Sequence, residues 1–218
     1  MKKMIGLIHA TPNSVLPMEN AVHKFAPNVN YLSFIDKELL DEVNKEGRVT
    51  GKLVRRIIKL IEIAEEAGVD GVALSCSSFT PFVPLIEHLF DFPVVSVDMA
   101  MLEKAVSIGE KIGVIATVAA AGPTTTNLIK EVAEKQHKEV EIFTETIIEA
   151  SVALKNGNSP KHDMLIQQKI HELAEVCDVI VIAQLSMVRA LDSAGELSVH
   201  ILSSGETAIK SLLSKLQH

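Results

Sequence analysis

Cys76 stands in the stretch of the chain whose residue types and spacing best suit proton-transfer or nucleophilic chemistry, Asp70-Gly-Val-Ala-Leu-Ser-Cys-Ser-Ser-Phe-Thr-Pro81. The apolar residues 72–74 predict a buried parallel strand, and Thr80 and Pro81 are typical of a helix start. A turn between such a strand and helix lies at the carboxyl edge of the sheet, where open α/β folds bind ligands. A nearby helix N-terminus should lower the pKa of the thiol and favour the reactive thiolate. The alternative is a buried, inert cysteine.

Hydroxyl groups follow Cys76 and favour an anionic ligand. Ser77 and Ser78 come directly after the cysteine, which places their hydroxyls and backbone N–H groups at the start of the predicted helix. Donors in that position bind anions such as carboxylates. The stretch therefore predicts a carboxylate-binding turn that carries a candidate reactive thiol.

Two further ionisable residues end predicted strands. His9 follows the strand at 4–8, where it is a candidate acid or base; the alternative is a histidine that only makes local hydrogen bonds. Asp98 follows the strand at 93–97, and we expect it to cap the next helix, with the orientation of a site residue as a second role.

The composition argues against nucleic acid and membrane as partners. The chain of 218 residues has a net charge of −7, no Trp and only 4 % aromatic residues. No apolar run reaches the roughly 18 residues of a membrane span, and the run at 4–8 is too short for a signal peptide.

The two cysteines, Cys76 and Cys177, are expected to be reduced thiols of a cytoplasmic protein. The eight histidines form no close pair and no cluster with cysteine, so we expect no metal site.

Strands and helices alternate along the whole chain, which predicts an α/β fold with parallel sheets. The region 36–43 is read as a short helix or an ordered loop. The expected strands are 4–8, 28–34, 72–74, 93–97, 111–116, 140–143, 179–183 and 199–202, and the expected helices are 18–25, 49–67, 82–90, 100–108, 128–136, 159–176 and 206–216.

The second half of the chain repeats the first. Residues 5–8 (Ile-Gly-Leu-Ile) match 112–115 (Ile-Gly-Val-Ile), and the segment from Asp70 matches the one from Asp178. The offsets are 107 residues for the glycines and 108 for the aspartates, and the strands at 93–97 and 199–203 follow in the same order. Matches that keep their order and spacing indicate an internal duplication.

A duplicated chain predicts two similar α/β lobes related by a pseudo-twofold axis, with the carboxyl edges of both sheets facing one cleft. We assign residues 1–97 and 207–218 to the first lobe and 98–206 to the second. The offset of 108 aligns Cys76 with Gln184. One wall of the cleft would then carry a thiol and the other an amide, which forms hydrogen bonds but does not exchange protons as an acid or base.

At this point the chain resembles the aspartate/glutamate racemase superfamily, which includes hydantoin racemases, maleate isomerases and arylmalonate decarboxylases. The resemblance covers nearly the whole chain, and the motifs that carry it are Ile5-Gly-Leu-Ile-His-Ala-Thr11, Ala73-Leu-Ser-Cys-Ser-Ser78, Gly113-Val-Ile-Ala-Thr117 and Val181-Ile-Ala-Gln-Leu-Ser-Met187. It implies two Rossmann-like lobes, a homodimer, no cofactor, and two cysteines on opposite sides of the α-carbon of a small carboxylate. One thiolate removes the α-proton, and the other thiol returns a proton to the opposite face.

The resemblance also assigns roles to residues of this sequence. Cys76 matches the first catalytic cysteine. Other positions match carboxylate-binding or neighbouring polar sites, and the substrate-binding candidates are therefore His9, Thr11, Ser77, Ser78, Thr117, Gln184 and Ser186. The departure is Gln184, which stands where two-cysteine members have their second cysteine. Cys177 precedes the strand at 179–183, at the end opposite to Gln184, and is expected to be a buried structural thiol.

These observations predict a cofactor-independent racemase or isomerase that acts at the carbon next to the carboxylate of a small amino acid or related acid, using Cys76. Because Gln184 replaces the second cysteine, one-sided chemistry stays open, as in a single-cysteine decarboxylase or cis–trans isomerase. A catalytically silent carboxylate-binding protein is the alternative from another class.

Overall fold

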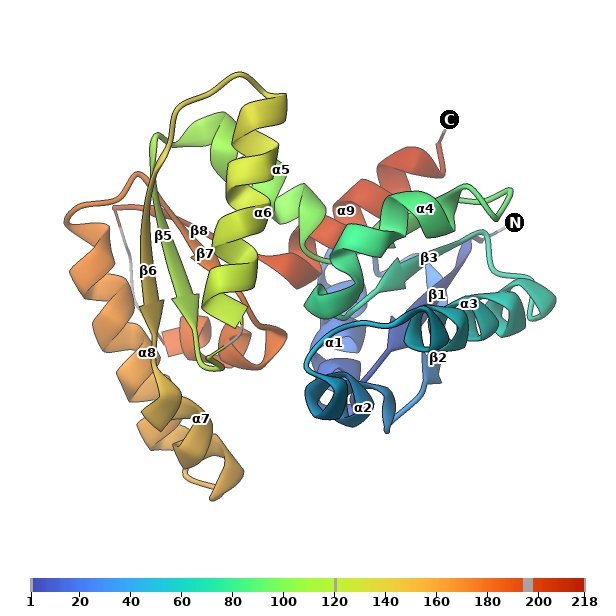
Figure 1. The fold of residues 1–218 in the computed structure, drawn as a ribbon, viewed down its shortest axis with the longest axis horizontal. Helices are drawn as coiled ribbons and strands as arrows, with labels where there is room; N and C mark the ends of the chain where they lie inside the picture. Colours follow the sequence, from blue (N-terminus) through green and yellow to red (C-terminus); the bar gives the residue numbers. More distant parts are fainter. Residues whose placement is uncertain (1, 120, 194–197, 218) are drawn as a thin grey trace. The chain divides into compact units, whose positions relative to one another are not determined.

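Two four-stranded parallel sheets organise the chain (Figure 1). The computed structural model describes residues 2–119, 121–193 and 198–217. Its strands are β1 (Met4–His9), β2 (Asn30–Ile35), β3 (Gly71–Leu74), β4 (Val94–Ser96), β5 (Lys111–Ala116), β6 (Glu141–Thr146), β7 (Val179–Ile182) and β8 (His200–Ser203). The strand order is β2-β1-β3-β4 in one sheet and β6-β5-β7-β8 in the other. The predicted α/β class with parallel sheets is confirmed.

Helices lie between the strands along the chain. The α-helices are α1 (Val15–Phe25), α2 (Leu39–Glu46), α3 (Gly51–Glu66), α4 (Val83–Glu87), α5 (Met99–Ile108), α6 (Ala121–Lys135), α7 (Ile148–Lys155), α8 (Ser159–Ala174) and α9 (Ser204–Lys215), and the 3₁₀ helices are η1 (Pro12–Ser14), η2 (Ser77–Phe82) and η3 (Leu185–Ser193). No helix in the part of the chain that the structure describes is both long and apolar enough to cross a membrane.

The chain divides into two compact units. The first contains Met1–Ala100 and Gly205–His218, and the second contains Met101–Ser204. Each unit therefore holds one sheet, and the closing helix α9 belongs to the sheet of the first unit.

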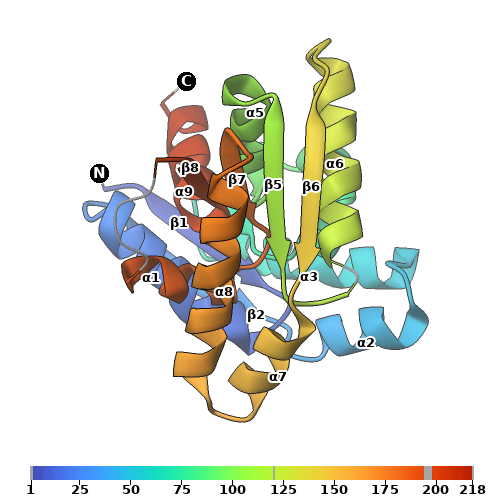
Figure 2. The same ribbon diagram turned by 90° about the vertical axis from the view of Figure 1, so that its left-hand side faces the viewer.

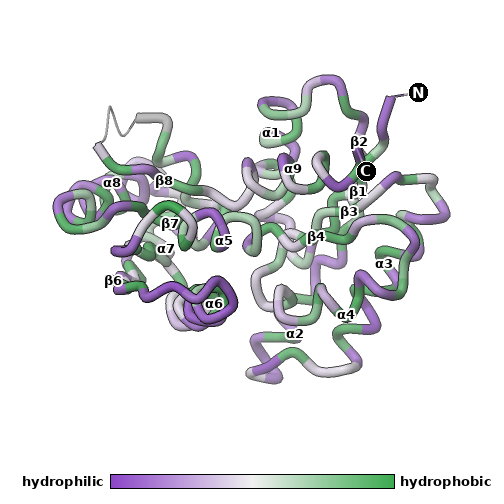
Figure 3. Tube along the Cα trace, turned by 90° about the horizontal axis from the view of Figure 1, so that it is seen from above, coloured by the Kyte–Doolittle hydropathy of each residue, from purple (hydrophilic) through white to green (hydrophobic). Residues whose placement is uncertain are grey.

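Helices α3 and α9 cover opposite faces of the first sheet. A Cβ atom on Gly6 would lie 3.4 Å from the Cβ of Ala64 in α3, and one on Gly71 would lie 3.0 Å from Leu212 in α9. Gly71 is paired with Ile5, the neighbour of Gly6, and neighbouring residues of a strand face opposite sides of the sheet. Because both faces are covered, β3 is buried along its whole length, as a continuous apolar strand requires. In Figure 3, hydrophobic and hydrophilic residues alternate along α3, which buries one side of this helix and exposes the other.

The second sheet is covered in the same manner. A Cβ atom on Gly113 would lie 3.2 Å from Leu173 in α8, while Gly122 of α6 lies against Thr144 of β6. Thr144 is paired with Val114, the neighbour of Gly113, so α6 and α8 lie on opposite faces. Figure 2 shows α6 and α8 along the sheet formed by β5 and its neighbours.

The shared strand order supports the internal duplication. Helices α3 and α8 begin 108 residues apart, at Gly51 and Ser159, and each packs on the glycine of a central strand, Gly6 or Gly113. The same offset relates Cys76 to Gln184, so these two residues hold equivalent places at the ends of β3 and β7.

Several helix bounds differ by a few residues from the prediction, and α6 and α7 differ most, for physical reasons. Helix α6 begins at Ala121 rather than at residue 128, although Gly122 and Pro123 disfavour a helix interior. Proline is tolerated in a first turn, and the absent side chain of Gly122 lets α6 approach Thr146, whose Oγ1 would lie only 2.8 Å from a Cβ atom there. Helix α7 was not predicted because its apolar residues lack a clear helical period; it packs against α8.

Candidate functional site

Pairing of the strands places Cys76 at the carboxyl edge of the first sheet. Leu74 is paired with Ile8 of β1 on one side and with Ser96 of β4 on the other. Cys76 and Asp98 each lie two residues beyond this level, so the ends of β3 and β4 bring them to the same part of the edge. The backbone of Cys76 is extended, and the 3₁₀ helix η2 begins directly after it.

The Cys76 thiol is buried and surrounded by hydrogen-bond donors. Only 6 % of the residue is exposed. Burial raises the pKa of the thiol to about 11 and the charge of Asp98 adds to this effect, whereas hydrogen bonds from the backbone N–H and hydroxyl of Ser78 and from the N–H of Phe79 lower it. The expectation of a depressed pKa is therefore wrong: the predicted N–H groups are in place, but burial outweighs them. Cys76 rests as a protonated thiol.

Asp98 is a buried carboxylate held by hydroxyl groups. It is 5 % exposed, and Thr80 Oγ1 donates a hydrogen bond to its Oδ2 at 3.0 Å. Burial raises the pKa of Asp98, and hydrogen bonds from the Ser77 and Thr80 side chains oppose this rise. At the start of α5 the backbone N–H of Met99 donates to Ser96 Oγ at 3.1 Å, and the bonds found for Asp98 go to hydroxyl groups of η2. Asp98 therefore binds η2, the segment that follows Cys76.

His9 belongs to a buried network of hydroxyl groups. Its ring is fully buried, and Nδ1 lies 2.8 Å from Ser75 Oγ and 3.0 Å from Ser14 Oγ. Ser75 also donates to the backbone oxygen of Ile8, and Ser14 to that of Thr11. The Nε2 atom of His9 has no hydrogen-bond partner among the described residues. Of the two roles considered for His9, the structure supports local hydrogen bonding. These bonds connect the loop after β1 to Ser75, the residue before Cys76.

We predict that His9 makes folding stability depend on pH. Burial lowers the pKa of His9 from 6.5 to about 4, with the charge of Glu19 opposing the shift. Between these two pH values the unfolded chain binds a proton that the folded chain does not, so stability falls as the pH drops through this window. The loss should approach about 3 kcal/mol at about pH 4. Urea unfolding at several pH values measures it.

The His9→Gln variant should lose less stability than the wild type between neutral and acidic pH, because a glutamine takes up no proton. His88→Gln, a change at an exposed histidine, is the matched control and should behave as the wild type. If the His9→Gln variant and the wild type lose the same free energy of unfolding between neutral and acidic pH, His9 is not the source of the pH dependence.

The other candidates of the first unit lie in the two loops beside Cys76. Thr11 caps η1, where its Oγ1 accepts from the N–H of Asn13 at 3.5 Å. Ser77 and Ser78 are partly exposed, but the Ser77 hydroxyl is directed to Asp98 and that of Ser78 to Cys76. The sequence did not single out Ser14, and Thr80 was expected only as a helix cap; the pairing of β3 with β4 is what brings Thr80 to Asp98.

Thr117 and Gln184 are joined in the second unit. Gln184 Oε1 accepts hydrogen bonds from the backbone N–H of Thr117 at 2.6 Å and from its hydroxyl at 3.0 Å. Since both bonds use the amide oxygen, Gln184 can offer its NH₂ group to a ligand only as a donor. Ser186 lies partly exposed in η3. Cys177 is 8 % exposed and packs in the hydrophobic core of this unit, as predicted for a structural thiol.

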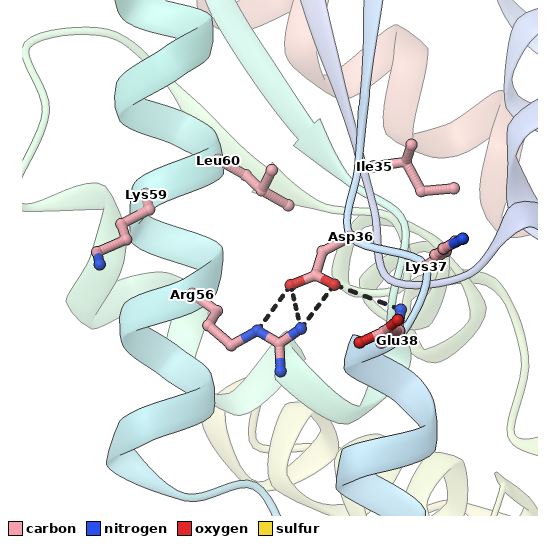
Figure 4. A pocket seen from close by; sticks show the side chains of 7 residues that line it. All are labelled: Ile35, Asp36, Lys37, Glu38, Arg56, Lys59 and Leu60. Atoms are coloured by element: carbon pink, nitrogen blue, oxygen red, sulfur yellow. Dashed lines mark hydrogen bonds and ion pairs between the residues drawn. The ribbon is translucent and has the colours of Figure 1, made fainter.

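A pocket of about 460 Å³ lies at the carboxyl end of β2 and is lined by Ile35, Asp36, Lys37, Glu38, Arg56, Lys59 and Leu60 (Figure 4). The guanidinium group of Arg56, one of the lining residues, is already paired with carboxylates. Arg56 makes two hydrogen bonds of 2.7 Å to Asp36 and contacts Glu42 at 2.6 Å. Because two carboxylates neutralise this cation, we read the cluster as a link between α3, α2 and the end of β2 rather than as an anion site.

Removal of that link should destabilise the first unit. We expect the Arg56→Met variant to lose about 1 kcal/mol, because the two hydrogen bonds to the partly buried Asp36 are lost while the apolar stem is kept. Urea denaturation gives the change as a shift in midpoint. Arg55→Met, an exposed position of the same helix, is the control, and a similar loss in both variants would rule out the link.

Comparison with known proteins gives a family match and several structural neighbours. The family model described as Asp/Glu/Hydantoin racemase matches residues 37–212. An aspartate racemase homologue from Pyrococcus horikoshii OT3 has a similar structure, with a TM-score of 0.76, 19 % identity and 100 % of both chains covered. No curated protein matches the chain in sequence.

Two further neighbours are named racemases. Allantoin racemase from Klebsiella pneumoniae has a TM-score of 0.71 at 17 % identity, covering 98 % of this chain and 87 % of its own. A glutamate racemase from Bacillus anthracis has a TM-score of 0.71 at 17 % identity, covering 99 % and 82 %. At these identities the neighbours show the same fold.

Proposed function

Since the chain belongs to the Asp/Glu/Hydantoin racemase family, we propose that it is a cofactor-independent racemase or isomerase that acts at the carbon next to a carboxylate, with Cys76 as the proton-transfer group. The substrate class that we propose is a small amino acid or a related acid. The observation that carries the proposal is the Cys76 turn itself: a buried thiol at the carboxyl edge of a parallel sheet, with the N–H and hydroxyl of Ser78 as hydrogen-bond donors to its sulfur.

In the proposed mechanism Cys76 moves one proton on one face of the substrate. As a thiol it donates its proton to the α-carbon of an enolate-like intermediate and becomes a thiolate. In the reverse direction the thiolate takes the α-proton and becomes a thiol. The N–H and hydroxyl of Ser78, at the start of η2, lower the cost of the negative charge on sulfur because they donate hydrogen bonds to it.

We propose that hydroxyl and amide donors hold the substrate, and we assign them for each unit by itself. In the first unit, Thr11 and Ser78 would bind its carboxylate. In the second unit, Ser186 and the NH₂ group of Gln184 would contact the substrate, and Thr117, whose N–H and hydroxyl both bind Gln184, would act by orienting that amide. Ser77 would contribute through its backbone N–H, because its hydroxyl serves Asp98. His9 would act by positioning the loop rather than by contact, as its ring is buried.

The single thiol favours a second candidate reaction. Gln184 has no proton to exchange and its oxygen is engaged by Thr117, so nothing at this position replaces a second cysteine as acid or base. Chemistry on one face alone, such as decarboxylation or cis–trans isomerisation, needs only Cys76. A catalytically silent carboxylate-binding protein would retain the donors and turn nothing over.

Proton NMR in heavy water with aspartate, glutamate, hydantoins, maleate and substituted malonates tests these proposals. Loss of the α-proton signal with inversion supports racemisation. Exchange with retention, loss of carbon dioxide or alkene isomerisation supports one-sided chemistry. If calorimetry detects tight binding of a carboxylate with no turnover, the binding protein is favoured.

We also propose that the protein is a homodimer in the cytoplasm. Analytical ultracentrifugation tests the oligomeric state.

A further inference from the structure

Asp98 is a buried ionisable group to which the proposed mechanism gives no role, and it lies beside the reactive thiol. We propose that Asp98 is a positioning residue of the Cys76 site: its carboxyl group fixes the η2 turn through Ser77 and Thr80, and its charge, when it is ionised, opposes a negative charge on the neighbouring thiol. This inference deepens the site of the proposed function, but its test needs no substrate and does not depend on which reaction the protein catalyses.

The position of Asp98 follows from the pairing of β3 and β4. The backbone N–H of Val97 donates to the oxygen of Leu74 at 3.1 Å, so the two strands stay paired up to the residues before Cys76 and Asp98. Thr80 then reaches back from η2 to Asp98 at 3.0 Å, and Ser77 bonds the same carboxylate. Both hydroxyls come from η2, the turn that begins directly after Cys76, so Asp98 holds the segment that positions the thiol.

The buried position of both groups makes their interaction strong. Cys76 is 6 % and Asp98 is 5 % exposed, so little water lies between them to screen their charges. The largest charge effect on Cys76 comes from Asp98, and it disfavours the thiolate. η2 adds hydroxyl and N–H groups but no charged side chain, and His9 at the end of the neighbouring β1 is neutral at pH 7 because burial lowers its pKa to about 4.

One consequence concerns the direction of the proton. Two negative charges in one buried site are unfavourable, so an ionised Asp98 favours the thiol. Burial already favours the thiol form of Cys76, so the resting site starts as a proton donor, and an ionised Asp98 adds to this effect. Formation of the thiolate then requires that substrate binding or protonation of Asp98 offset the repulsion. If a neutral side chain held the η2 turn, no neighbouring charge would favour the thiol over the thiolate.

The test is a titration of the Cys76 thiolate by its ultraviolet absorbance from about pH 7 to about pH 10. The background is the Cys177→Ala variant, and the Cys76→Ala titration is subtracted to remove the Tyr31 phenol. We expect Asp98→Asn to contain about ten-fold more thiolate than the background protein at a given pH. Asp98→Ser, a smaller uncharged replacement, should shift the titration in the same direction and serves if Asp98→Asn does not fold.

Two controls separate charge from structure. Asp91→Asn removes an exposed carboxylate of the same unit and should leave the titration unchanged. Thr80→Val breaks the hydrogen bond to Asp98 but keeps the charge, so it should shift the titration much less than Asp98→Asn. The proposal is overturned if a folded Asp98→Asn or Asp98→Ser protein titrates as the background does, or if Thr80→Val shifts the thiolate as far as removal of the charge.

Discussion

Replacement of Cys76 by alanine should lower the rate of substrate turnover by about 10³-fold or more, the usual contribution of a positioned proton-transfer group. The variant keeps the donors at the start of η2, so it should still bind carboxylates. Cys76 is a small residue of the hydrophobic core of the first unit, and alanine removes only its sulfur atom, so the fold should survive. The measurement is the exchange of the substrate α-proton with heavy water, followed by NMR on the compound that the wild type converts.

Cys177→Ala is the matched control, since it removes the other thiol from the core of the second unit. It should retain the wild-type exchange rate. Full activity in a folded Cys76→Ala protein would exclude the thiol from the chemistry, and comparable losses in both variants would point to destabilisation instead.

The sheets could be predicted from the sequence because their strands carry strong local signals. Residues 72–74 and 179–182 are continuous apolar runs, and in the structure both are buried along their length. The family expected from the motifs at 5–11, 73–78, 113–117 and 181–187 is confirmed by the match over residues 37–212. Helix α6 was predicted short because its first turn is set by packing against Thr144 and Thr146, which lie far along the chain and give no local signal.

The chemistry of the site could be predicted only in part. Strand order and the turn residues suffice to place Cys76 at a sheet edge with N–H donors. The acid strength of its thiol depends on burial and on Asp98, which comes from a different strand. Likewise, the partner of Asp98 is a hydroxyl 18 residues earlier, a contact that pairing of β3 with β4 creates. The pKa of a buried thiol depends on burial and on hydrogen bonds and charges from several parts of the fold. Residue type alone therefore predicts the wrong direction for the pKa shift of Cys76.

Substitution of Gln184 by cysteine should create or increase racemisation of an amino acid that the protein binds. The internal duplication gives Gln184 the place in the second unit that Cys76 has in the first. Inversion at a carbon requires one group that removes the proton and another that returns a proton to the opposite face. In the two-cysteine racemases that the sequence resembles, this position carries the second thiol, so a thiol at 184 would supply the missing group. Chiral chromatography of the product, with NMR exchange in heavy water, detects the gain.

The Gln184→Ala variant is the control that isolates the new thiol. Both variants lose the two hydrogen bonds from Thr117, so both should lose about 1–3 kcal/mol of stability from the unpaired Thr117 groups. Only the cysteine variant adds an ionisable group, and its gain in inversion should depend on Cys76, vanishing in the Cys76→Ala background. A folded, substrate-binding Gln184→Cys protein without inversion would count against the alignment of the two positions. A gain shared with Gln184→Ala would place the second proton donor elsewhere, because then the lost amide rather than the new thiol would be responsible.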